Sequence, residues 1–411
     1  DHAWPADELM PLSCEGRIRG ISEGRGASDE VLGNFSLTLI DSLDSLAIMG
    51  KLNEFETSVG LVIDNVRFDQ NFDVSVFETN IRVLGGLLSA HVISTELKRR
   101  TNHMEWYSGQ LLEMGREVGH RLLPAFNTTT GLPRPLVNLR YGITDSLRQR
   151  KETCTACAGS MILEFSALSS LSKDGIFQEV ATKAMNFLWK QRHRGSDLMG
   201  SIINVETGDW IHRDSGVGAG FDSYYEYCLK AYMLLGDVSY LDRFDKHYNA
   251  VMRYIRQGPF MVNVHMHRPD ETARKFMDSL LAFWPAVQVL KGDLKHAIEM
   301  YEMLNHVFTK YQFIPEAFTH TFDVHWKEHN LRPEFIESTY FLYKATQDPY
   351  YLDIGREIIT RINKYARVGC GFAAFRDVRI LSHEDSIFVN ETDEMKTDKV
   401  VAQLHLTKST I

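Results

Sequence analysis

One recurring turn constrains the fold of this chain more than any other feature of its sequence. At each occurrence an apolar helix end is followed by a small or polar pair, an aspartate, and a helix that opens on an aromatic or apolar residue. The copies are LSSLSKDGIF, YMLLGDVSYL, QVLKGDLKHA and LYKATQDPYY, with aspartates at Asp174, Asp237, Asp293 and Asp348. Successive aspartates are 63 (237 − 174), 56 (293 − 237) and 55 (348 − 293) residues apart, which leaves room for a helix pair and a loop. The sequence therefore predicts a series of helical hairpins.

Helical hairpins of this kind stack in two ways. They run on as an open solenoid, or they close into an α/α toroid whose helix ends and connecting loops surround one central cavity. The repeat alone favours neither the solenoid scaffold nor the toroid.

Helical spacing of apolar residues, with caps and breakers at the ends, predicts most of the secondary structure. The expected helices span residues 36–49, 75–97, 105–122, 156–171, 176–192, 220–235, 238–256, 273–290, 294–310, 334–345 and 349–365. Strand signals are few: a hairpin over 201–213 and an alternating segment over 260–267. Because no linker-like tract interrupts the chain, we expect one large domain over 1–385 and a divergent, disordered tail over 386–411.

The charge and hydropathy of the chain argue against two classes of partner. The 411 residues carry a formal net charge of -9, whereas nucleic-acid-binding proteins need a basic surface. No run approaches the roughly 18 consecutive apolar residues of a membrane span, and the first residues lack the basic and apolar regions of a signal peptide. We expect a soluble mature chain with no nucleic-acid partner and no transmembrane segment.

Five cysteines are too few for a disulfide scaffold, but four of them form two notable pairs. Cys14 and Cys370 lie near opposite ends of the chain, which a closing toroid would bring together, so we expect a disulfide there. Cys154 and Cys157 form a single C-x-x-C motif, which favours a redox pair or two unreactive thiols over a structural zinc site. Candidate glycosylation sequons, typical of a secretory chain, begin at Asn34, Asn127 and Asn390.

A carboxylate and a guanidinium share one face of the helix expected at 75–97. Glu78, Arg82 and Gly85 lie at positions i, i+4 and i+7, opposite an apolar stripe. An ordinary helix ion pair beside a close helix contact is the simpler interpretation of this pattern. A functional carboxylate is the alternative.

The segment DSGVGAGFDSYYEYCLK places three glycines before a helix that carries Asp222 and Glu226. Glycine-rich loops can hold phosphate, but no strand precedes this loop and its spacing is not G-x-G-x-x-G, so we discard a nucleotide site. Carboxylates beside tyrosine rings suit sugar binding. A capped, tyrosine-rich core helix explains the same residues equally well.

Further acidic residues follow prolines directly. Glu334 and Glu337 lie in the first turn of an expected helix, where acids also stabilise the helix dipole, and Glu316 follows another proline. With Glu78, Asp222, Glu316 and the turn that carries Glu334 and Glu337, the chain has four acidic positions at helix starts or chain breaks. A toroid would point such a set into one cavity, and glycoside hydrolysis requires one protonated acid and one ionised base.

Eight motifs follow one another between residue 1 and about residue 385 in the order of a known family. They are PADELMPLSC, FSLTLIDSLDSL, VSVFETNIRVLGGLLSAH, LLPAFNTTTGLP, TCTACAG, GVGAGFDSYYEYCLKAY, LRPEFIESTYFLYKAT and CGFAAFRDVR. Through them the chain resembles glycoside hydrolase family 47, and within it the EDEM branch of ER degradation-enhancing α-mannosidase-like proteins. The resemblance implies an all-α fold, an (α/α)7 barrel with a few short β-hairpins. It also implies inverting hydrolysis of α-1,2-linked mannose and a calcium ion (Ca2+) at the barrel floor.

The resemblance also implies roles for individual residues. The expected catalytic residues are Glu78, Asp222, Glu316 and Glu334. The expected substrate-binding residues are Arg82, Glu164 and Glu337. Among them, Glu78 in FETNIR resembles the general acid, and Glu334 in RPEFIES resembles the base that activates water. In an inverting enzyme such a pair is about 6.5–9.5 Å apart.

Two departures from the family pattern bear on the fold and on the metal. After SHED the chain reads SIFVNETDEMKTDK in place of the family's long apolar helix, and the helix upstream of DHAWPADEL is also absent. We therefore expect the first and last barrel helices to be missing. The family's Thr-Glu-Ala-His segment, whose threonine ligates calcium, is absent too, so no residue is assigned to the metal.

Three functions fit these observations. The first is an α-1,2-mannosidase of the endoplasmic reticulum lumen that trims oligomannose N-glycans of misfolded glycoproteins and promotes their degradation. The second is a mannose-binding receptor that does not hydrolyse, and the third is an inactive fragment or helical scaffold. The EDEM resemblance and the cysteines also suggest a protein disulfide isomerase-like oxidoreductase as a partner.

Overall fold

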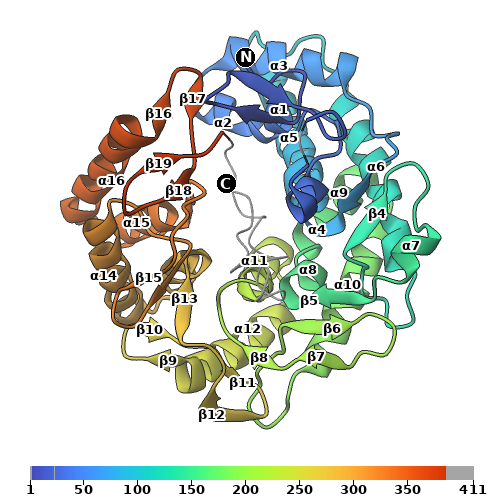
Figure 1. Ribbon diagram of the computed structural model, residues 1–411. Coiled ribbons are helices and arrows are strands. Elements are labelled where there is room, and N and C mark those ends of the chain that lie inside the picture. The colour runs from blue at the N-terminus through green and yellow to red at the C-terminus, as the bar shows by residue number, and fades with distance from the viewer. Residues whose placement is uncertain (1, 23, 386–411) are drawn as a thin grey trace.

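The computed structural model describes residues 2–22 and 24–385, and these form a ring of helices (Figure 1). Consecutive helices pack as hairpins around the ring, which identifies the (α/α) barrel, the toroid and not the open solenoid. The expected tail over 386–411, with the sequon at Asn390, lies outside the described residues. Across the described ranges, no helix combines the length and the apolar character that crossing a membrane requires.

Helices make up most of the ring. The α-helices are α1 (Leu37–Asp41), α2 (Leu43–Ile48), α3 (Leu52–Asn65), α4 (Val76–Glu78), α5 (Gly85–Arg100), α6 (Gln110–Leu122), α7 (Asp145–Arg148), α8 (Thr155–Gly159), α9 (Ile162–Ser172), α10 (Ile176–Gln191), α11 (Asp222–Leu235), α12 (Val238–Ala250), α13 (Trp284–Lys291), α14 (Leu294–Tyr311), α15 (Glu334–Thr346) and α16 (Pro349–Arg361). The 3-10 helices are η1 (Gly26–Val31), η3 (Leu123–Phe126) and η5 (Ser279–Phe283), and the π-helices are η2 (Thr79–Leu84), η4 (Val251–Ile255) and η6 (Ile362–Ala366).

The strands are short and form small antiparallel sheets. They are β1 (Glu8–Met10), β2 (Glu15–Arg17), β3 (Asp73–Ser75), β4 (Leu136–Asn138), β5 (Glu152–Cys154), β6 (Ile202–Asn204), β7 (Trp210–His212), β8 (Asp214–Ser215), β9 (Arg256–Gln257), β10 (Phe260–Met261), β11 (Val264–His265), β12 (Arg268–Thr272), β13 (Phe276–Asp278), β14 (Ala317–Thr319), β15 (Val324–Trp326), β16 (Arg367–Val368), β17 (Gly371–Phe372), β18 (Phe375–Asp377) and β19 (Ser382–His383). The three-stranded sheets are β5–β6–β7, β8–β11–β12 and β13–β14–β15.

The recurring turn joins the two helices of each hairpin by the same local geometry. The residue before the aspartate adopts the left-handed conformation, which ends the first helix, at Lys173, Gly236, Gly292 and Gln347. The aspartate side chain then accepts a hydrogen bond from a backbone N–H two or three residues later, at Ile176, Ser239, His296 and Tyr350. At Asp237, Asp293 and Asp348 the aspartate is the N-cap of the second helix, while Asp174 lies one residue before the N-cap Gly175 of α10.

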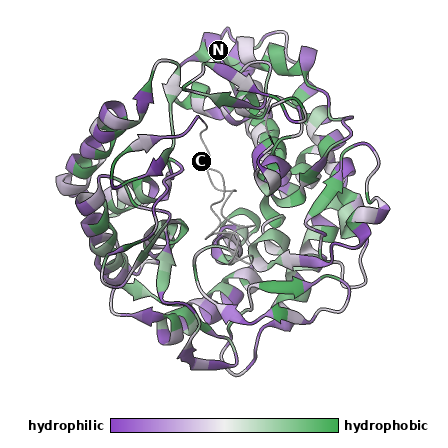
Figure 2. Ribbon diagram, viewed as in Figure 1, coloured by the Kyte–Doolittle hydropathy of each residue, from purple (hydrophilic) through white to green (hydrophobic). Residues whose placement is uncertain are grey.

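A hydrophobic core runs around the ring between the helices. In each hairpin the two helices pack on each other, as in α9 with α10, α11 with α12, α13 with α14, and α15 with α16. Trp284 at the start of α13 and Phe165 in α9 are fully buried. Figure 2 shows hydrophobic residues distributed all around the ring, while α16 on its outer side carries many hydrophilic ones.

Three expectations about local structure need correction. Helix α3 had no counterpart among the expected helices. The helix expected over 273–290 begins only at Trp284, because strand β13 and the 3-10 helix η5 precede it. The strand expected over 260–267 is split into β10 and β11, which belong to different sheets. The hairpin over 201–213 is confirmed as β6 and β7.

The two ends of the described chain meet and close the ring. The turn between β1 and β2 carries Cys14, whose sulfur is bonded to that of Cys370 between β16 and β17, with a Cα–Cα distance of 5.5 Å. The Leu12 and Ser13 amides donate hydrogen bonds to one carboxylate oxygen of Asp385, at 2.7 and 3.1 Å. Residues 356 positions apart are thereby linked covalently.

Candidate active site

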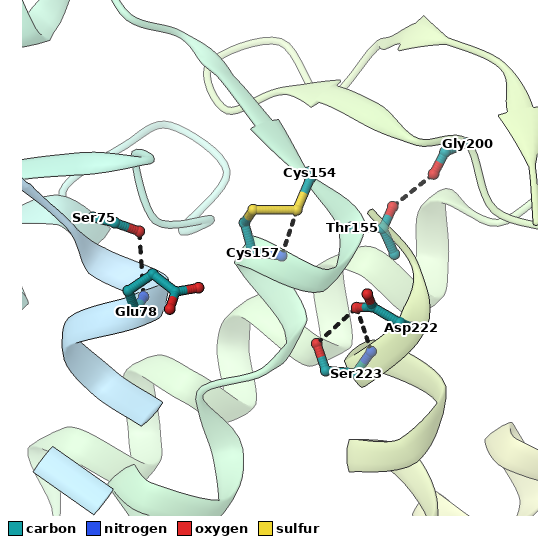
Figure 3. The surroundings of a disulfide bond; sticks show 8 residues. All are labelled: Ser75, Glu78, Cys154, Thr155, Cys157, Gly200, Asp222 and Ser223. Atoms are coloured by element: carbon teal, nitrogen blue, oxygen red, sulfur yellow. Dashed lines mark hydrogen bonds between the residues drawn. A yellow bond between two sulfur atoms is a disulfide. The ribbon is translucent and has the colours of Figure 1, made fainter. Parts of the chain in front are cut away.

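The elements α4, α8 and η5 begin directly after a short strand, whereas α11 follows the loop 216–221. Acidic residues lie near the β3–α4 and β13–η5 junctions and at the start of α11. Strand β3 ends at Ser75 and α4 follows with Glu78, strand β13 ends at Asp278, and α11 opens with Asp222. Strand β5 ends at Cys154, directly before α8. In Figure 3 the Cys154–Cys157 disulfide lies between Glu78 and Asp222. The strand–helix junctions therefore gather functional groups that are far apart in the sequence.

Glu78 lies at the junction of α4 and the π-helix η2. Its side chain is 1% exposed, and its carboxylate accepts a hydrogen bond of 2.7 Å from Nε of Arg82. Arg82 also donates to Asp41 at 3.1 Å. Burial by itself disfavours the Arg82 guanidinium, but the charges of Glu78 and Asp41 outweigh it and raise the Arg82 pKa. Glu78 is thus held in an ion pair inside the ring wall.

The glycine-rich loop before α11 brings Asp222 and Asp278 together. Asp278, at the end of β13, accepts the N–H of Ala219 at 3.2 Å, and a Cβ on Gly218 would lie 2.2 Å from the same carboxylate. The loop therefore needs a glycine at position 218 so that its backbone can approach Asp278. Asp222 accepts a 2.6 Å hydrogen bond from the N–H of Ser223.

The carboxyl group of Asp278 has a raised pKa. Its pKa is raised from 3.8 to about 6, chiefly by burial and also by the negative charge of Asp222, while the hydrogen bond from Ala219 and the charges of Arg274 and Arg332 oppose the rise. A carboxyl group with such a pKa carries a proton for part of the time near neutral pH, which is the property that general acid catalysis requires.

Glu316 and Glu334 lie on either side of one arginine. Glu316 is fully buried and accepts hydrogen bonds from Nε of Arg332 at 3.0 Å and from its terminal nitrogen at 2.7 Å. Burial disfavours the Arg332 guanidinium, but Glu316 and the nearby Glu334 and Asp278 raise its pKa overall. Glu334 opens α15 and is 4% exposed. Glu316 therefore fixes Arg332 beside Glu334.

Glu164 and Glu337 belong to an electrostatic network around Lys230. Burial raises the pKa of Glu164, against hydrogen bonds from the Tyr227 hydroxyl at 2.6 Å and the Asn80 amide at 2.8 Å. Burial lowers the pKa of Lys230, but the carboxylates of Glu226, Glu337 and Glu164 reverse this and raise it. The partly exposed ammonium group of Lys230 is thereby balanced by three carboxylates.

The tyrosines of α11 do not form a surface that could cover a sugar ring. Tyr224 and Tyr225 are fully buried and pack against His247, while Tyr225 also contacts Trp284. Their rings belong to the core, as the interpretation of a tyrosine-rich core helix requires. Only the Tyr227 hydroxyl reaches an acidic residue of the site, Glu164.

The described residues do not supply the ligands of a metal site. In residues 2–22 and 24–385 there is no group of three or more His, Cys, Asp or Glu side chains that could hold a metal ion. The calcium ion implied by the family resemblance is therefore not matched by the residues of this part of the chain, and no step is assigned to it.

Two site residues were absent from the sequence prediction. Asp278 was missed because the prediction sought acids at helix starts, whereas Asp278 ends a strand. Arg332 was missed although it stands two residues before Glu334 in LRPEF, which is the signal that could have indicated it. The structure brings Asp222, Asp278, Arg332 and Glu334 into one set of interacting charges.

Comparisons with known proteins agree on one family. The sequence model of glycosyl hydrolase family 47 matches residues 1–395. The Xenopus laevis protein "ER degradation-enhancing alpha-mannosidase-like protein 3" is 60% identical over 387 residues, which cover 93% of this chain and 42% of that protein. An alpha-mannosidase I of Arabidopsis thaliana is 43% identical over 398 residues, covering 95% of this chain and 61% of its own length. The chain thus spans less than two thirds of the length of these relatives.

Solved structures agree on the fold. An alpha-1,2-mannosidase from Trichoderma reesei superposes with a TM-score of 0.78 at 22% sequence identity, covering 100% of this chain and 90% of that chain. The cellobiose 2-epimerase of Spirochaeta thermophila superposes less closely, with a TM-score of 0.59 at 9% identity, covering 87% of this chain and 98% of that chain. Both likenesses concern the helical barrel alone.

Proposed function

Because the chain belongs to glycosyl hydrolase family 47, we propose that it hydrolyses terminal α-1,2-linked mannose on oligomannose N-glycans, with inversion at the anomeric carbon. The observation that carries the proposal is a set of four buried acids: Glu78 and Asp278 lie beside the ends of strands β3 and β13, and Asp222 and Glu334 are the first residues of α11 and α15. An inverting glycosidase needs one carboxyl group that holds a proton and one that is ionised. Asp278 meets the first condition.

The acid and the base are assigned from their surroundings. Asp278 is the proton donor, because burial keeps its carboxyl group protonated at a higher pH than an exposed aspartate, and its proton passes to the glycosidic oxygen. Glu334 is the base that takes a proton from water, since it lies in the first turn of α15 beside Arg332, where a negative charge is stabilised.

Glu78 receives a different role from the one that the family resemblance implies. Its carboxylate is engaged by Nε of Arg82 at 2.7 Å in a buried ion pair. We assign Glu78, with Arg82 and Glu164, to binding sugar hydroxyl groups or a water molecule. Asp222 stays close to Asp278 and raises its pKa. Glu316 positions Arg332.

The biological setting follows from the names of the relatives. We place the chain in the endoplasmic reticulum lumen, acting on misfolded glycoproteins, because the relatives in Xenopus laevis and human are named ER degradation-enhancing proteins. The two disulfides in the described part of the chain fit an oxidising compartment. A protein disulfide isomerase-like oxidoreductase remains a proposed partner.

The test is release of mannose from a Man9 glycopeptide by the purified chain, followed by mass spectrometry. Glu334→Gln should lower the rate at saturating substrate about 10³-fold, because no other base would activate the water. The matched control is Glu117→Gln on the outer helix α6, which removes an equal charge at a partly exposed site and should leave the rate unchanged.

Each outcome of this test has a definite meaning. Hexose loss that disappears in Glu334→Gln supports the hydrolase. Binding of the glycopeptide without hexose loss supports the mannose-binding receptor, and absence of both, in a chain folded by circular dichroism, leaves the helical scaffold. Parallel reactions with calcium and with a chelator show whether turnover needs the metal.

A further inference from the structure

The Cys154–Cys157 disulfide occupies one of the strand–helix junctions that otherwise carry acids. Strand β5 ends at Cys154, α8 begins at the next residue, and the two cysteine Cα atoms are 4.9 Å apart. Cys154 is 2% exposed, whereas Cys157 is only half-buried. The sulfur of Cys157 is therefore the more accessible end of the bond.

Helix α8 connects the acidic positions on its two sides. The Ala156 amide donates a 2.9 Å hydrogen bond to the carbonyl of Gly220, in the glycine loop that leads to Asp222. On the other side the Asn80 amide donates to the Ser160 carbonyl at 3.2 Å. Figure 3 shows the disulfide between Glu78 and Asp222. The five residues of α8 thus lie between α4, which carries Glu78, and α11, which begins with Asp222.

Hydrogen bonds through the glycine loop also connect α8 with Asp278, the proposed proton donor. The loop that accepts the Ala156 hydrogen bond at Gly220 also donates the Ala219 N–H to Asp278. A helix of only five residues has little stability of its own, because a single turn forms few internal hydrogen bonds. The short covalent loop between Cys154 and Cys157 removes conformational freedom from this turn.

We propose that the Cys154–Cys157 disulfide is a thiol-reducible positioning element of the active site, which holds α8 so that the glycine loop keeps Asp278 in place. Its opening lowers the rate of the chemical step. The predicted effect of reduction on activity rests on the proposed mannosidase function. The predicted effect of reduction on the mobility of the backbone does not.

The reaction is a thiol–disulfide exchange with a dithiol reductant. A thiolate of the reductant attacks the Cys157 sulfur, the bond between the two cysteine sulfurs breaks, and Cys154 leaves as a thiolate that takes up a proton. The second thiol of the reductant then displaces Cys157 and forms the reductant's own disulfide. Two electrons and two protons pass to the two cysteines, and oxidised glutathione reverses the exchange.

Turnover provides the first readout. The full chain is treated with rising dithiothreitol, alkylated, mapped by mass spectrometry and assayed on a Man9 glycopeptide. The rate at saturating substrate should fall about tenfold as Cys154 and Cys157 become alkylated, with KM changed less than about twofold. Oxidised glutathione, added before alkylation, should restore the rate. Cys154→Ala/Cys157→Ala should show the lower rate from the start and no response to mild reductant.

The second disulfide gives the matched control. Loss of activity that follows alkylation of Cys14 and Cys370, while Cys154 and Cys157 remain bonded, would overturn the proposal. A double variant at Cys154 and Cys157 with the wild-type rate would overturn it too. A thermal midpoint shared by the variant and the wild type shows that the lower rate is not a consequence of unfolding.

Hydrogen exchange provides a readout that needs no mannosidase activity. Reduction should increase exchange about tenfold at the Ala156 amide and in residues 216–224, and leave helix α14 unchanged. If the oxidised chain releases no mannose, the proposed function fails on its own. In that case unchanged exchange in residues 153–160 and 216–224 overturns the positioning role, and increased exchange supports it.

Discussion

At the scale of single residues, the acidic side chains of this site differ in the groups that surround them. Glu78 and Glu316 form ion pairs with the guanidinium groups of Arg82 and Arg332. Burial and the charge of Asp222 raise the pKa of Asp278, while the Ala219 N–H and the more distant charges of Arg274 and Arg332 oppose the rise. Sequence alone does not distinguish these surroundings, because each partner comes from a distant segment.

Asp278→Asn tests the protonation of Asp278 through stability and activity together. Burial raises the pKa of Asp278 from 3.8 to about 6, so the folded protein binds this proton more tightly than the unfolded chain. Stability is therefore lost as the pH rises from about 4 through about 6. We expect the variant to be more stable than the wild type by about 3 kcal/mol at pH 8, and equally stable below about pH 4.

Mannose release by Asp278→Asn should fall about 10²- to 10³-fold, because an amide cannot donate the catalytic proton. Chemical denaturation across the pH range and turnover of a Man9 glycopeptide provide the two measurements. A stability difference that does not change with pH would contradict the raised pKa of Asp278.

The two sequons inside the described residues differ in their access to a glycan. The Asn34 side chain accepts the Arg19 N–H at 3.1 Å and donates to the Arg19 carbonyl at 3.3 Å, in a left-handed backbone with φ 53°. Asn127 is exposed after η3. We expect Asn127→Gln, but not Asn34→Gln, to remove one glycan from the secreted chain, as measured by mass.

Thr129→Ala gives the control for this prediction, because it destroys the sequon and leaves Asn127 in place. Asn34→Gln should instead lower the free energy of unfolding by about 1–2 kcal/mol, since it breaks the hydrogen bonds to Arg19. A glycan found on Asn34 would show that this side chain leaves its position in the fold.

At the scale of elements, the glycine loop before α11 makes the site possible. A Cβ on Gly218 would lie 2.2 Å from the Asp278 carboxylate, so Gly218→Ala must displace either the loop or the acid. We expect mannose release to fall at least about tenfold and the free energy of unfolding to fall by about 1–3 kcal/mol. Turnover and thermal denaturation measure the two effects.

Gly355→Ala is the matched control for Gly218→Ala. A Cβ on Gly355 in α16 would meet nothing within 4 Å, so alanine should stabilise the helix by about 0.5–1 kcal/mol and leave turnover unchanged. Equal losses in both variants would show that the close approach of the loop to Asp278 is not what matters at position 218.

The elements also show what could and could not be predicted from the sequence. The helical hairpins follow from the recurring aspartate because its cap is local: the left-handed residue, the aspartate and the capped amide are within a few positions of each other. Helix α3 lacks this signal, since its N-cap Lys51 makes no side-chain capping hydrogen bond. Asp278 was missed because β13 depends on pairing with β14, about 40 residues away.

At the scale of the whole molecule, the Cys14–Cys370 disulfide closes the ring where its first and last strands meet. It joins positions 356 residues apart, and a long loop gains the most from a covalent link because the unfolded chain loses more freedom. We expect Cys14→Ser/Cys370→Ser to lower the free energy of unfolding by about 2–5 kcal/mol, measured by chemical denaturation without reductant.

Asp385→Asn distinguishes the contribution of the Cys14–Cys370 disulfide from that of the hydrogen bonds beside it. This variant weakens the hydrogen bonds from the Leu12 and Ser13 amides but leaves the disulfide intact, so its cost should be only about 0.5–1.5 kcal/mol. If the two variants lose the same free energy, closure of the ring rests on the local hydrogen bonds and not on the bond between the sulfurs.

The bond between Cys14 and Cys370 also changes how the protein responds to cleavage. Between these residues the backbone and the disulfide together form one covalent circle. A protease that cuts a single peptide bond inside this circle opens it without releasing a fragment, so the nicked protein keeps its mass, apart from the added water, until a reductant divides it. Two cuts, not one, are needed before any helical hairpin can leave the ring.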